Sequence, residues 1–376
     1  MKIGIPLEVS PHENRVAITP EIVKKTVGLG CEVWVQKGAG ESAHFSDAAY
    51  KDAGANLGTA KQIFACPLVL KVRAPEPKEI KTMASGTAVI GMLSPFNQSN
   101  VAVMAKQGLT AFSLEKLPRN TRAQSMDVLS SQANVAGYKS ILLANQFYQR
   151  LMPMLMTAAG TIKAARVLVL GAGVAGLQAI ATAKRLGAVV EASDVRPSVK
   201  EQITSLGAKF IDVPYETEEE KNIAAGESGY ASAMPAAWMA RQAALVAQRA
   251  KDADMVITSA LIPGRQPPIL IDENTVKRMK SGAVIVDLAA GLGKGGAGNC
   301  PLTVANEVVT VNGVTIVGYT NLPSLVSTDA SSLYARNVFE FMKLLLKEDG
   351  TLLLPNDDEL VQACMICHQG NVVESS

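Results

Sequence analysis

Apolar and polar positions alternate along the chain in blocks that predict strands and helices in turn. Within the first 120 residues, short apolar runs are separated by stretches with helical spacing; the runs are KIGI, CEVWVQ, PLVLKV, TAVIGML and LTAFSL. Continuous apolar runs of this length are typical of parallel strands that are buried on both faces. This section of the chain therefore predicts an α/β domain.

A second alternation runs from Arg166 to about Thr320. Its apolar runs are RVLVL, AVVEAS, AKFIDV, DMVITSA, AVIVDLA and VTIVGY, with helices expected around 197–206, 236–250 and 273–280. Strands alternating with helices predict a doubly wound parallel sheet. We therefore expect an α/β protein of two Rossmann-like, doubly wound parallel-sheet domains with a cleft between them.

The two patterns also predict where the domains meet. A long helix is expected from about 124 to 150, and the helical stretch SSLYARNVFEFMKLLLK follows the second alternation and is expected to pack on the first domain. The predicted domains are 1–130 plus 321–376, which is discontinuous, and a nucleotide-binding domain at 131–320. Ligand sites often lie between domains, so the cleft is the expected place for a bound nicotinamide.

A glycine-rich turn, GAGVAG at 171–176, lies directly between the strand RVLVL and a predicted helix. In this context Gly171 permits the tight turn, Gly173 lets a pyrophosphate approach the backbone, and Gly176 lets the helix pack closely on the strand. Val174 opens the helix, whose N-terminal N–H groups are available to phosphates. The turn therefore predicts a dinucleotide site.

Asp194 ends the next apolar run and lies 23 residues after Gly171. A carboxylate at this distance accepts hydrogen bonds from the adenosine ribose and repels a 2′-phosphate, which favours NAD(H) over NADP(H). Val195 and Arg196 follow it and are included in the predicted cofactor site, although a nearby arginine can also accommodate the 2′-phosphate. The alternative is that Asp194 only caps the helix that begins near Pro197.

Residues 213–235 interrupt the alternation with many charges and no apolar period. A long segment without its own structure inside a compact domain is usually functional or disordered. It predicts a mobile flap over the nucleotide, with Gly229 and Tyr230 near its tip; a solvated surface loop is the alternative.

Composition narrows the classes of protein. The 376 residues are enough for about two domains, and 48% hydrophobic residues with a net charge of +2 indicate an ordered globular chain without the basic surface that nucleic acids require. No membrane-spanning run or export signal is found, and five cysteines fit a reduced, cytoplasmic compartment. CMICH at 364–368 matches a haem-attachment pattern, but the missing export signal favours no haem and no metal.

Two stretches carry a resemblance to a known family. PRNTRAQSMDVLSSQANVAGYKS at 118–140 and TAAGTIKAARVLVLGAGVAGLQAIATAKRLGAVVEASDVRP at 157–197 closely resemble the NAD(H)-binding soluble component of proton-translocating nicotinamide nucleotide transhydrogenases. SGYASAM, TSALIPGRQPP and GGAGNCP also match, and the resemblance covers nearly the whole chain. AAGLGKGGAGNC at 289–300 is longer than the family pattern, which leaves the local loop geometry open.

The resemblance implies a function and partners. In that family the component binds NAD(H) and passes a hydride directly to NADP+ held by a separate NADP(H)-binding component, while a membrane component couples the transfer to proton movement. It implies a homodimer that is cytoplasmic and associated with the inner membrane through its partner.

The resemblance also assigns roles to the loop that precedes the long helix. Arg119 would contact the nicotinamide or pyrophosphate, Gln124 would reach toward the partner's nicotinamide, and Asp127 and Ser130 would orient the carboxamide. Tyr230 corresponds to the tyrosine of the family's mobile loop. Without the resemblance, the four loop residues are also explained by a helix N-terminus with an Arg–Asp pair.

Two other functions stay open. Alanine dehydrogenases share IPLEV…ENRVA and LKVRAP, with Arg15 and Lys71 matching residues that hold pyruvate. The histidine and aspartate that move protons in that family have no counterpart here, and His12 is expected on a surface turn. A non-catalytic NAD(H) sensor is the second alternative.

Overall fold

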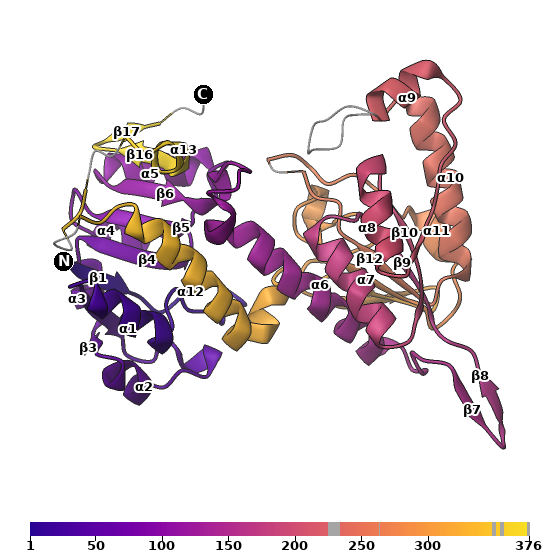
Figure 1. Ribbon diagram of the computed structural model, residues 1–376, viewed down its shortest axis with the longest axis horizontal. Coiled ribbons are helices and arrows are strands. Elements are labelled where there is room, and N and C mark those ends of the chain that lie inside the picture. Colours follow the sequence, from indigo (N-terminus) through magenta and orange to yellow (C-terminus); the bar gives the residue numbers. More distant parts are fainter. Residues whose placement is uncertain (225–233, 263, 348–350, 354–356, 374–376) are drawn as a thin grey trace. The chain divides into compact units, whose positions relative to one another are not determined.

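The computed structural model describes residues 1–224, 234–262, 264–347, 351–353 and 357–373, and it divides into two compact units (Figure 1). The first unit comprises Met1–Gln132 and Pro323–Ser376, and the second comprises Ala133–Leu322. Each unit has its own central sheet. The predicted flap residues Gly229 and Tyr230 lie outside the described residues.

The first unit is built on an eight-stranded sheet with the order β17-β16-β6-β5-β4-β1-β2-β3. Its strands are β1 (Lys2–Ile5), β2 (Glu32–Gln36), β3 (Asn56–Gly58), β4 (Leu68–Arg73), β5 (Ala88–Met92), β6 (Thr110–Ser113), β16 (Met365–His368) and β17 (Asn371–Val372). Strands β1 to β6 are parallel, whereas β16 pairs antiparallel with both β6 and β17. The order reverses between β1 and β4, which makes this the switch point of a doubly wound sheet.

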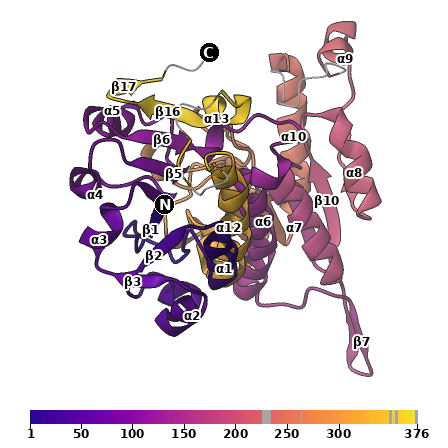
Figure 2. The ribbon, with the colours of Figure 1, turned by 60° about the vertical axis from the view of Figure 1, so that its left-hand side comes forward.

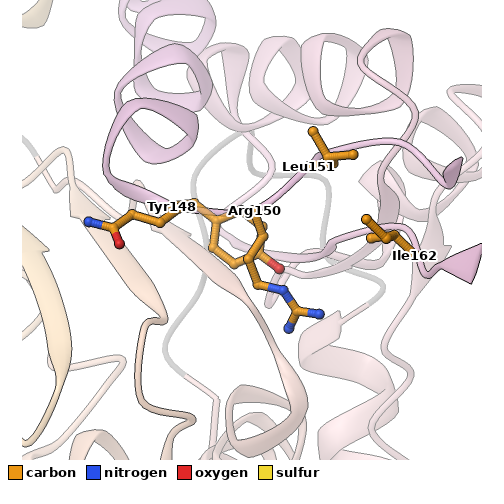
Figure 3. Close-up of a pocket in the computed structure, with 5 residues that line it drawn as sticks. Tyr148, Arg150, Leu151 and Ile162 are labelled. Atoms are coloured by element: carbon orange, nitrogen blue, oxygen red, sulfur yellow. The ribbon is translucent and has the colours of Figure 1, made fainter. Parts of the chain in front are cut away.

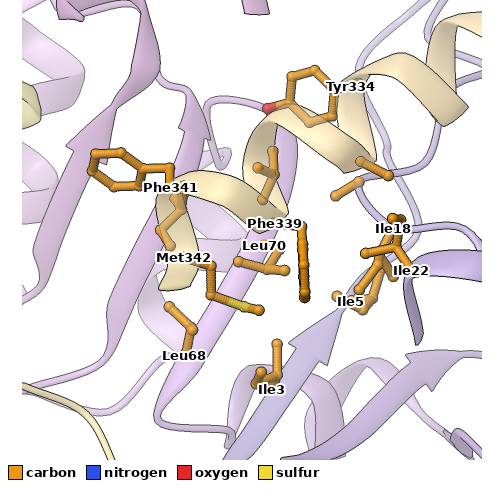
Figure 4. Close-up of a cluster of buried hydrophobic side chains, with 14 of the residues drawn as sticks. Ile3, Ile5, Ile18, Ile22, Leu68, Leu70, Tyr334, Phe339, Phe341 and Met342 are labelled. Atoms are coloured by element: carbon orange, nitrogen blue, oxygen red, sulfur yellow. The ribbon is translucent and has the colours of Figure 1, made fainter. Parts of the chain in front are cut away.

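Helices cover both faces of this sheet. They are α1 (Pro20–Gly28), α2 (Asp47–Asp52), α3 (Ala60–Phe64), α4 (Pro77–Thr82), α5 (Gln98–Lys106), α12 (Ser327–Lys343) and α13 (Glu359–Cys364), with short 3-10 turns η1 (Glu41–Ala43), η2 (Leu114–Lys116), η3 (Gln124–Met126) and η6 (Leu322–Val326). Alternate residues of β4 face opposite ways: Leu68 and Leu70 join one core and Val69 joins the other. The C-terminal helix α12 packs Phe341 and Met342 into the first of these cores (Figure 4).

The second unit has a seven-stranded sheet with the order β11-β10-β9-β12-β13-β15-β14. Its strands are β9 (Arg166–Leu170), β10 (Val189–Ser193), β11 (Lys209–Phe210), β12 (Met255–Thr258), β13 (Val284–Asp287), β14 (Val308–Val311) and β15 (Val314–Val317). Numbered within this unit, the parallel strands follow the order 3-2-1-4-5-6 of dinucleotide-binding folds. The switch point lies between β9 and β12, which are neighbours in the sheet.

Helices pack on both faces of the second sheet as well. They are α6 (Val128–Phe147), which begins in the first unit, α7 (Val174–Arg185), α8 (Lys200–Ser205), α9 (Glu218–Ala224), α10 (Ala236–Asp252) and α11 (Glu273–Arg278), with 3-10 turns η4 (Pro197–Val199) and η5 (Lys294–Gly296). On β9, Val167 and Val169 belong to the core with α6, α7 and α8, whereas Leu168 and Leu170 face α10 and α11. The strand is buried on both faces, as its continuous apolar run predicts.

Three expectations from the sequence are wrong in detail. The sheets are not wholly parallel, because β14, β16 and β17 add antiparallel edges. The segment 213–235 is not without structure, since it contains the charged helix α9. The helix predicted from 124 begins at Val128 and is preceded by the turn η3.

A β-hairpin that the sequence pattern did not predict projects from the second unit as an arm (Figures 1 and 2). Its strands are β7 (Leu155–Thr157) and β8 (Gly160–Ile162). Every residue of both strands is exposed, and the exposed fraction is 71% for Met156 and 60% for Met154. An isolated hairpin is marginally stable by itself, so the arm is a surface feature that a partner could cover.

Candidate dinucleotide site

The glycine turn leaves the sheet at its switch point. Strand β9 ends at Leu170, and Gly171 has a φ of +91°, a conformation that only glycine adopts readily. From the neighbouring strand end, Ser259 donates its backbone N–H to the carbonyl of Leu170 at 2.9 Å and its hydroxyl to that of Gly171 at 3.0 Å. The turn is therefore fixed to β12 as well as to β9.

The other two glycines of the turn have different surroundings. A Cβ on Gly176 would lie 1.9 Å from the carbonyl oxygen of Gly171, so only glycine allows α7 to begin this close to the strand. A Cβ on Gly173 would meet no atom within 4 Å, so the space above this backbone is open. Gly173 is the N-cap of α7 and gives no side-chain cap, which leaves the N–H groups of the first turn, beginning at Val174, for an anion.

Asp194 follows β10 and turns its carboxylate back to this loop. One oxygen, Oδ2, accepts the backbone N–H of Ala172 at 2.7 Å and Nη2 of Arg196 at 3.0 Å. The other, Oδ1, accepts the backbone N–H of Arg196 at 2.8 Å and its Nε at 3.0 Å. Hydrogen bonding to Asp194 raises the pKa of the Arg196 guanidinium above its ordinary value, against the effect of burial. Val195 packs instead against a small cluster of Val213, Met234 and Trp238.

The loop that precedes α6 lies in the first unit. Asp127 caps the helix, because its carboxylate accepts the backbone N–H of Ser130 at 2.9 Å and the Ser130 hydroxyl at 2.5 Å. Gln124 begins the turn η3 and is exposed, and Arg119 is also exposed. The structure thus brings Asp127 and Ser130 together as a helix cap, which by itself accounts for both residues.

These two groups of residues belong to different units, Gly171, Gly173, Gly176 and Asp194 to the second and the loop to the first. Their expected meeting at a cleft stays a prediction.

A buried carboxylate that the sequence reasoning missed organises the loops after β12 and β13. Asp287 is fully buried and accepts five hydrogen bonds: from the hydroxyls of Thr258 and Thr303 and from the backbone N–H groups of Ala289, Asn299 and Cys300, at 2.7 to 3.1 Å. These donors come from several separate segments, so no local spacing in the sequence signals them.

Asn299 joins the same two loops. Its amide donates to the carbonyls of Ala260 at 2.9 Å and Pro268 at 2.8 Å, and its oxygen accepts the N–H of Ala260 at 3.1 Å. Between Asp287 and Asn299 the longer loop is closed by backbone bonds from Gly291 to Gly296 and from Gly293 to Ala297. Its geometry is therefore a compact projection with a firmly held base.

Arg15 and Lys71 lie in the first unit, near its own switch point, and both are buried. Arg15 makes a bidentate ion pair with Glu13 at 2.7 and 2.6 Å, and Lys71 lies 2.9 Å from Glu79 and 3.3 Å from Glu8. Burial raises the pKa of the Glu8 carboxyl above its ordinary 4.5, although Lys71 opposes the shift. Both cations that could hold a keto acid already have carboxylate partners.

The CMICH segment has structural contacts. Cys364 belongs to one core of the first unit and Cys367 to the other, so their side chains lie on opposite faces of the sheet. Burial raises the pKa of Cys364 to about 12 and that of Cys367 to about 11. His368 bonds Thr110 through Nδ1 at 2.9 Å. Among the described residues, no group of three or more His, Cys, Asp or Glu side chains is placed to hold a metal ion.

A pocket of about 460 Å³ lies at the base of the hairpin arm, and its lining side chains are drawn in Figure 3. Tyr148, Arg150 and Leu151 line it from the segment after α6, and Ile162 lines it from β8. The predicted cofactor-binding residues that the structure describes do not line this pocket. No helix in the described portion of the chain is both long enough and apolar enough to cross a bilayer.

The strand order, the glycine turn at the switch point and the carboxylate after β10 define the doubly wound, dinucleotide-binding class of α/β proteins. Residues 4–136 match the family described as "Alanine dehydrogenase/PNT, N-terminal domain", and residues 140–375 match "Alanine dehydrogenase/PNT, C-terminal domain". The chain belongs to the alanine dehydrogenase/PNT family.

Individual relatives of this chain come from both branches of the family. The first portion of the NAD(P) transhydrogenase alpha subunit of Rhodospirillum rubrum, a separate chain, is 46% identical over 384 residues, covering 99% of this chain and 98% of the relative. A transhydrogenase structure from Sinorhizobium meliloti has a TM-score of 0.85 at 44% identity and covers 100% of this chain and 99% of that one. A structure titled L-alanine dehydrogenase has a TM-score of 0.81 at 25% identity, covering 100% and 97%. The resemblance read from the sequence and the predicted fold class are confirmed.

Proposed function

We propose that this chain is the NAD(H)-binding component of a proton-translocating transhydrogenase. A hydride passes directly between its NADH and NADP+ held by a partner component, and a membrane component couples the transfer to proton movement. The observation that carries the proposal is 46% identity to a transhydrogenase subunit over nearly the full length of both proteins. It is supported by a glycine turn and a carboxylate arranged as such a cofactor requires.

The second unit fits NAD(H) at three points. The open backbone at Gly173 admits the pyrophosphate, which a side chain there would obstruct. The first turn of α7, with Val174, offers N–H groups and the positive end of the helix dipole to the phosphates. Asp194 is placed beside the turn for the ribose hydroxyls, and Val195 and Arg196 border it. The nicotinamide supplies the hydride-transfer chemistry, and the chain holds and orients it.

The loop residues serve positioning in this proposal. Hydride transfer between two nicotinamides moves no proton to or from a substrate, so the chain needs no general acid or base and must instead fix distance, orientation and water exclusion. Asp127 and Ser130 form a fixed pair at the N-terminus of α6 that orients the carboxamide. Arg119 contacts the nicotinamide or the pyrophosphate, and the exposed Gln124 reaches toward the partner's nicotinamide. Gly229 and Tyr230 close over the nucleotide.

The chain acts as a homodimer that is cytoplasmic and reaches the inner membrane through its partner. The exposed apolar arm of β7 and β8 supports the dimer, because such a surface is stabilised when a second copy covers it.

Partner-dependent turnover tests the proposed function. The purified chain, a related NADP(H)-binding component, NADPH and an oxidised NAD+ analogue are mixed, and reduction of the analogue is followed. Reduction that requires both proteins is expected. A control with NADH, pyruvate and ammonium tests the alanine dehydrogenase alternative, for which the paired Arg15 and Lys71 leave no open carboxylate site. NADH binding without turnover in either mixture would instead indicate a non-catalytic sensor.

A further inference from the structure

Every acceptor position of the Asp194 carboxylate is occupied in the structure. A carboxylate offers about four lone-pair positions. Two are taken by backbone N–H groups, those of Ala172 and Arg196, and two by Nε and Nη2 of the Arg196 guanidinium. Ribose hydroxyls that are to bond this carboxylate must therefore displace a donor.

Only one of these donors can leave easily. Ala172 is buried in the glycine turn, and the N–H of Arg196 is fixed by the backbone that leads into η4 at Pro197. The guanidinium, in contrast, ends a flexible side chain that is 27% exposed, while the Asp194 side chain is 6% exposed. The guanidinium is thus the donor that an entering ribose replaces.

We propose that Arg196 sets the discrimination between NAD(H) and NADP(H) by occupying the acceptor positions that the NAD(H) ribose requires. This inference rests on the proposed function, since it assumes that NAD(H) binds at this turn. A bidentate guanidinium–carboxylate contact must be broken for NAD(H) to bind, which weakens the complex. Once released, the cation remains two residues from Asp194, where it can pair with the 2′-phosphate of NADP(H).

The inference makes an unusual expectation for one substitution. Arg196→Ala frees the Asp194 carboxylate, so NADH should bind more tightly, by about threefold to tenfold. The same change removes the cation available to a 2′-phosphate, so residual NADPH binding should weaken by about tenfold. The ratio of the two dissociation constants therefore rises by well over an order of magnitude.

Equilibrium titrations of the isolated full-length chain with NADH and with NADPH, followed by nucleotide fluorescence, test this expectation. Arg196→Lys is the second variant, because lysine keeps the charge but cannot make the bidentate contact; it should bind NADH more tightly and keep NADPH binding. Arg185→Ala is the matched control, since it removes an exposed cation from the opposite end of α7, and both affinities should stay unchanged.

Each outcome separates the two levels of the proposal. Tighter NADH and weaker NADPH binding by Arg196→Ala supports the inference. Equal weakening of both nucleotides would overturn it, because Arg196 would then contact a group that they share, and unchanged affinities would overturn it as well. Absence of NADH binding by the unaltered chain would overturn the proposed function itself, and this inference with it.

Discussion

Three glycines of one turn differ in what they require, although the sequence motif presents them as equals. Gly171 needs its positive φ, Gly176 needs the space that a Cβ would take, and Gly173 has neither constraint from the protein itself. What restricts Gly173 in the proposal is the approach of the pyrophosphate. Stability and binding can therefore be separated within six residues.

Gly176→Ala and Gly173→Ala should have opposite profiles. A methyl group at position 176 collides with the carbonyl of Gly171, so we expect a loss of about 3 kcal/mol in the free energy of unfolding. A methyl group at position 173 meets no protein atom, so stability should stay within about 1 kcal/mol while NADH affinity falls at least tenfold. Denaturant unfolding and NADH titration of both variants provide the check; full NADH affinity in Gly173→Ala would remove the pyrophosphate from this position.

Gln124→Asn should separate catalysis from binding. The side chain becomes one methylene shorter, so its amide no longer reaches the partner's nicotinamide, and hydride transfer should slow by about tenfold or more. NADH affinity should change by less than twofold, because Gln124 is exposed in the free chain. Single-turnover rates and NADH titrations measure the two effects. Ser125→Ala, an exposed neighbour, is the control, and equal loss of rate and affinity would contradict the role of Gln124.

At the scale of elements, the sequence predicted the inner strands well and the outer ones poorly. Inner strands such as β9 are buried on both faces, and this produces continuous apolar runs. The edge strand β14 is short and partly exposed, and α9 is a charged helix, so neither has a strong apolar period. The hairpin of β7 and β8 was missed because its apolar residues face solvent rather than a core.

The candidate site shows the same division. The glycine turn and Asp194 could be predicted because their spacing along the chain reflects one local strand–turn–helix unit. The four hydrogen bonds of Asp194 and the five of Asp287 could not, since they depend on how separate segments meet after folding. The sequence placed Arg196 near a phosphate, but not on the carboxylate.

Asp287→Asn should destabilise the loops after β12 and β13. The amide presents an NH2 group to some of the five donors and removes the charge that they stabilise, so we expect a loss of about 3 kcal/mol in the free energy of unfolding. Thr303→Val, which removes a single donor at 2.7 Å, should cost about 1 kcal/mol. Urea unfolding of the two variants compares them, and equal losses would show that Asp287 is not the centre of this network.

At the scale of the whole molecule, buried charge in the first unit should make stability depend on pH. Burial raises the folded-state pKa of Glu8 above 4.5, so its contribution is fully present below that pH and is lost as the pH rises through the folded-state pKa. Relative to Glu8→Gln, the unaltered chain should lose stability over this window, with a slope of up to about 1.4 kcal/mol per pH unit. Unfolding curves at several pH values measure it, and parallel curves for the two proteins would contradict the burial of a titrating Glu8.

Assembly provides another prediction at this scale. Met156→Glu adds a charge to an exposed residue of the arm, so folding should be unaffected. If a second copy covers the arm, the charge becomes buried on association and should weaken the dimer by tenfold or more, at an approximate cost of 1.4 kcal/mol or above. Analytical ultracentrifugation measures the dissociation constant. An equal change in Lys163→Glu, an exposed residue beyond β8, would point to general charge repulsion instead.

The central claim is that this chain's nucleotide exchanges a hydride directly with a second nucleotide, and isotope transfer tests it most directly. NADH carrying deuterium at both C4 positions is mixed with the chain, the NADP(H)-binding component and NADP+ in ordinary water. The account predicts that the NADPH formed carries deuterium at C4, and that none forms when the chain is omitted. NADPH that contains only protium would contradict it, because the hydrogen would then have come from solvent through a group that the proposal does not contain.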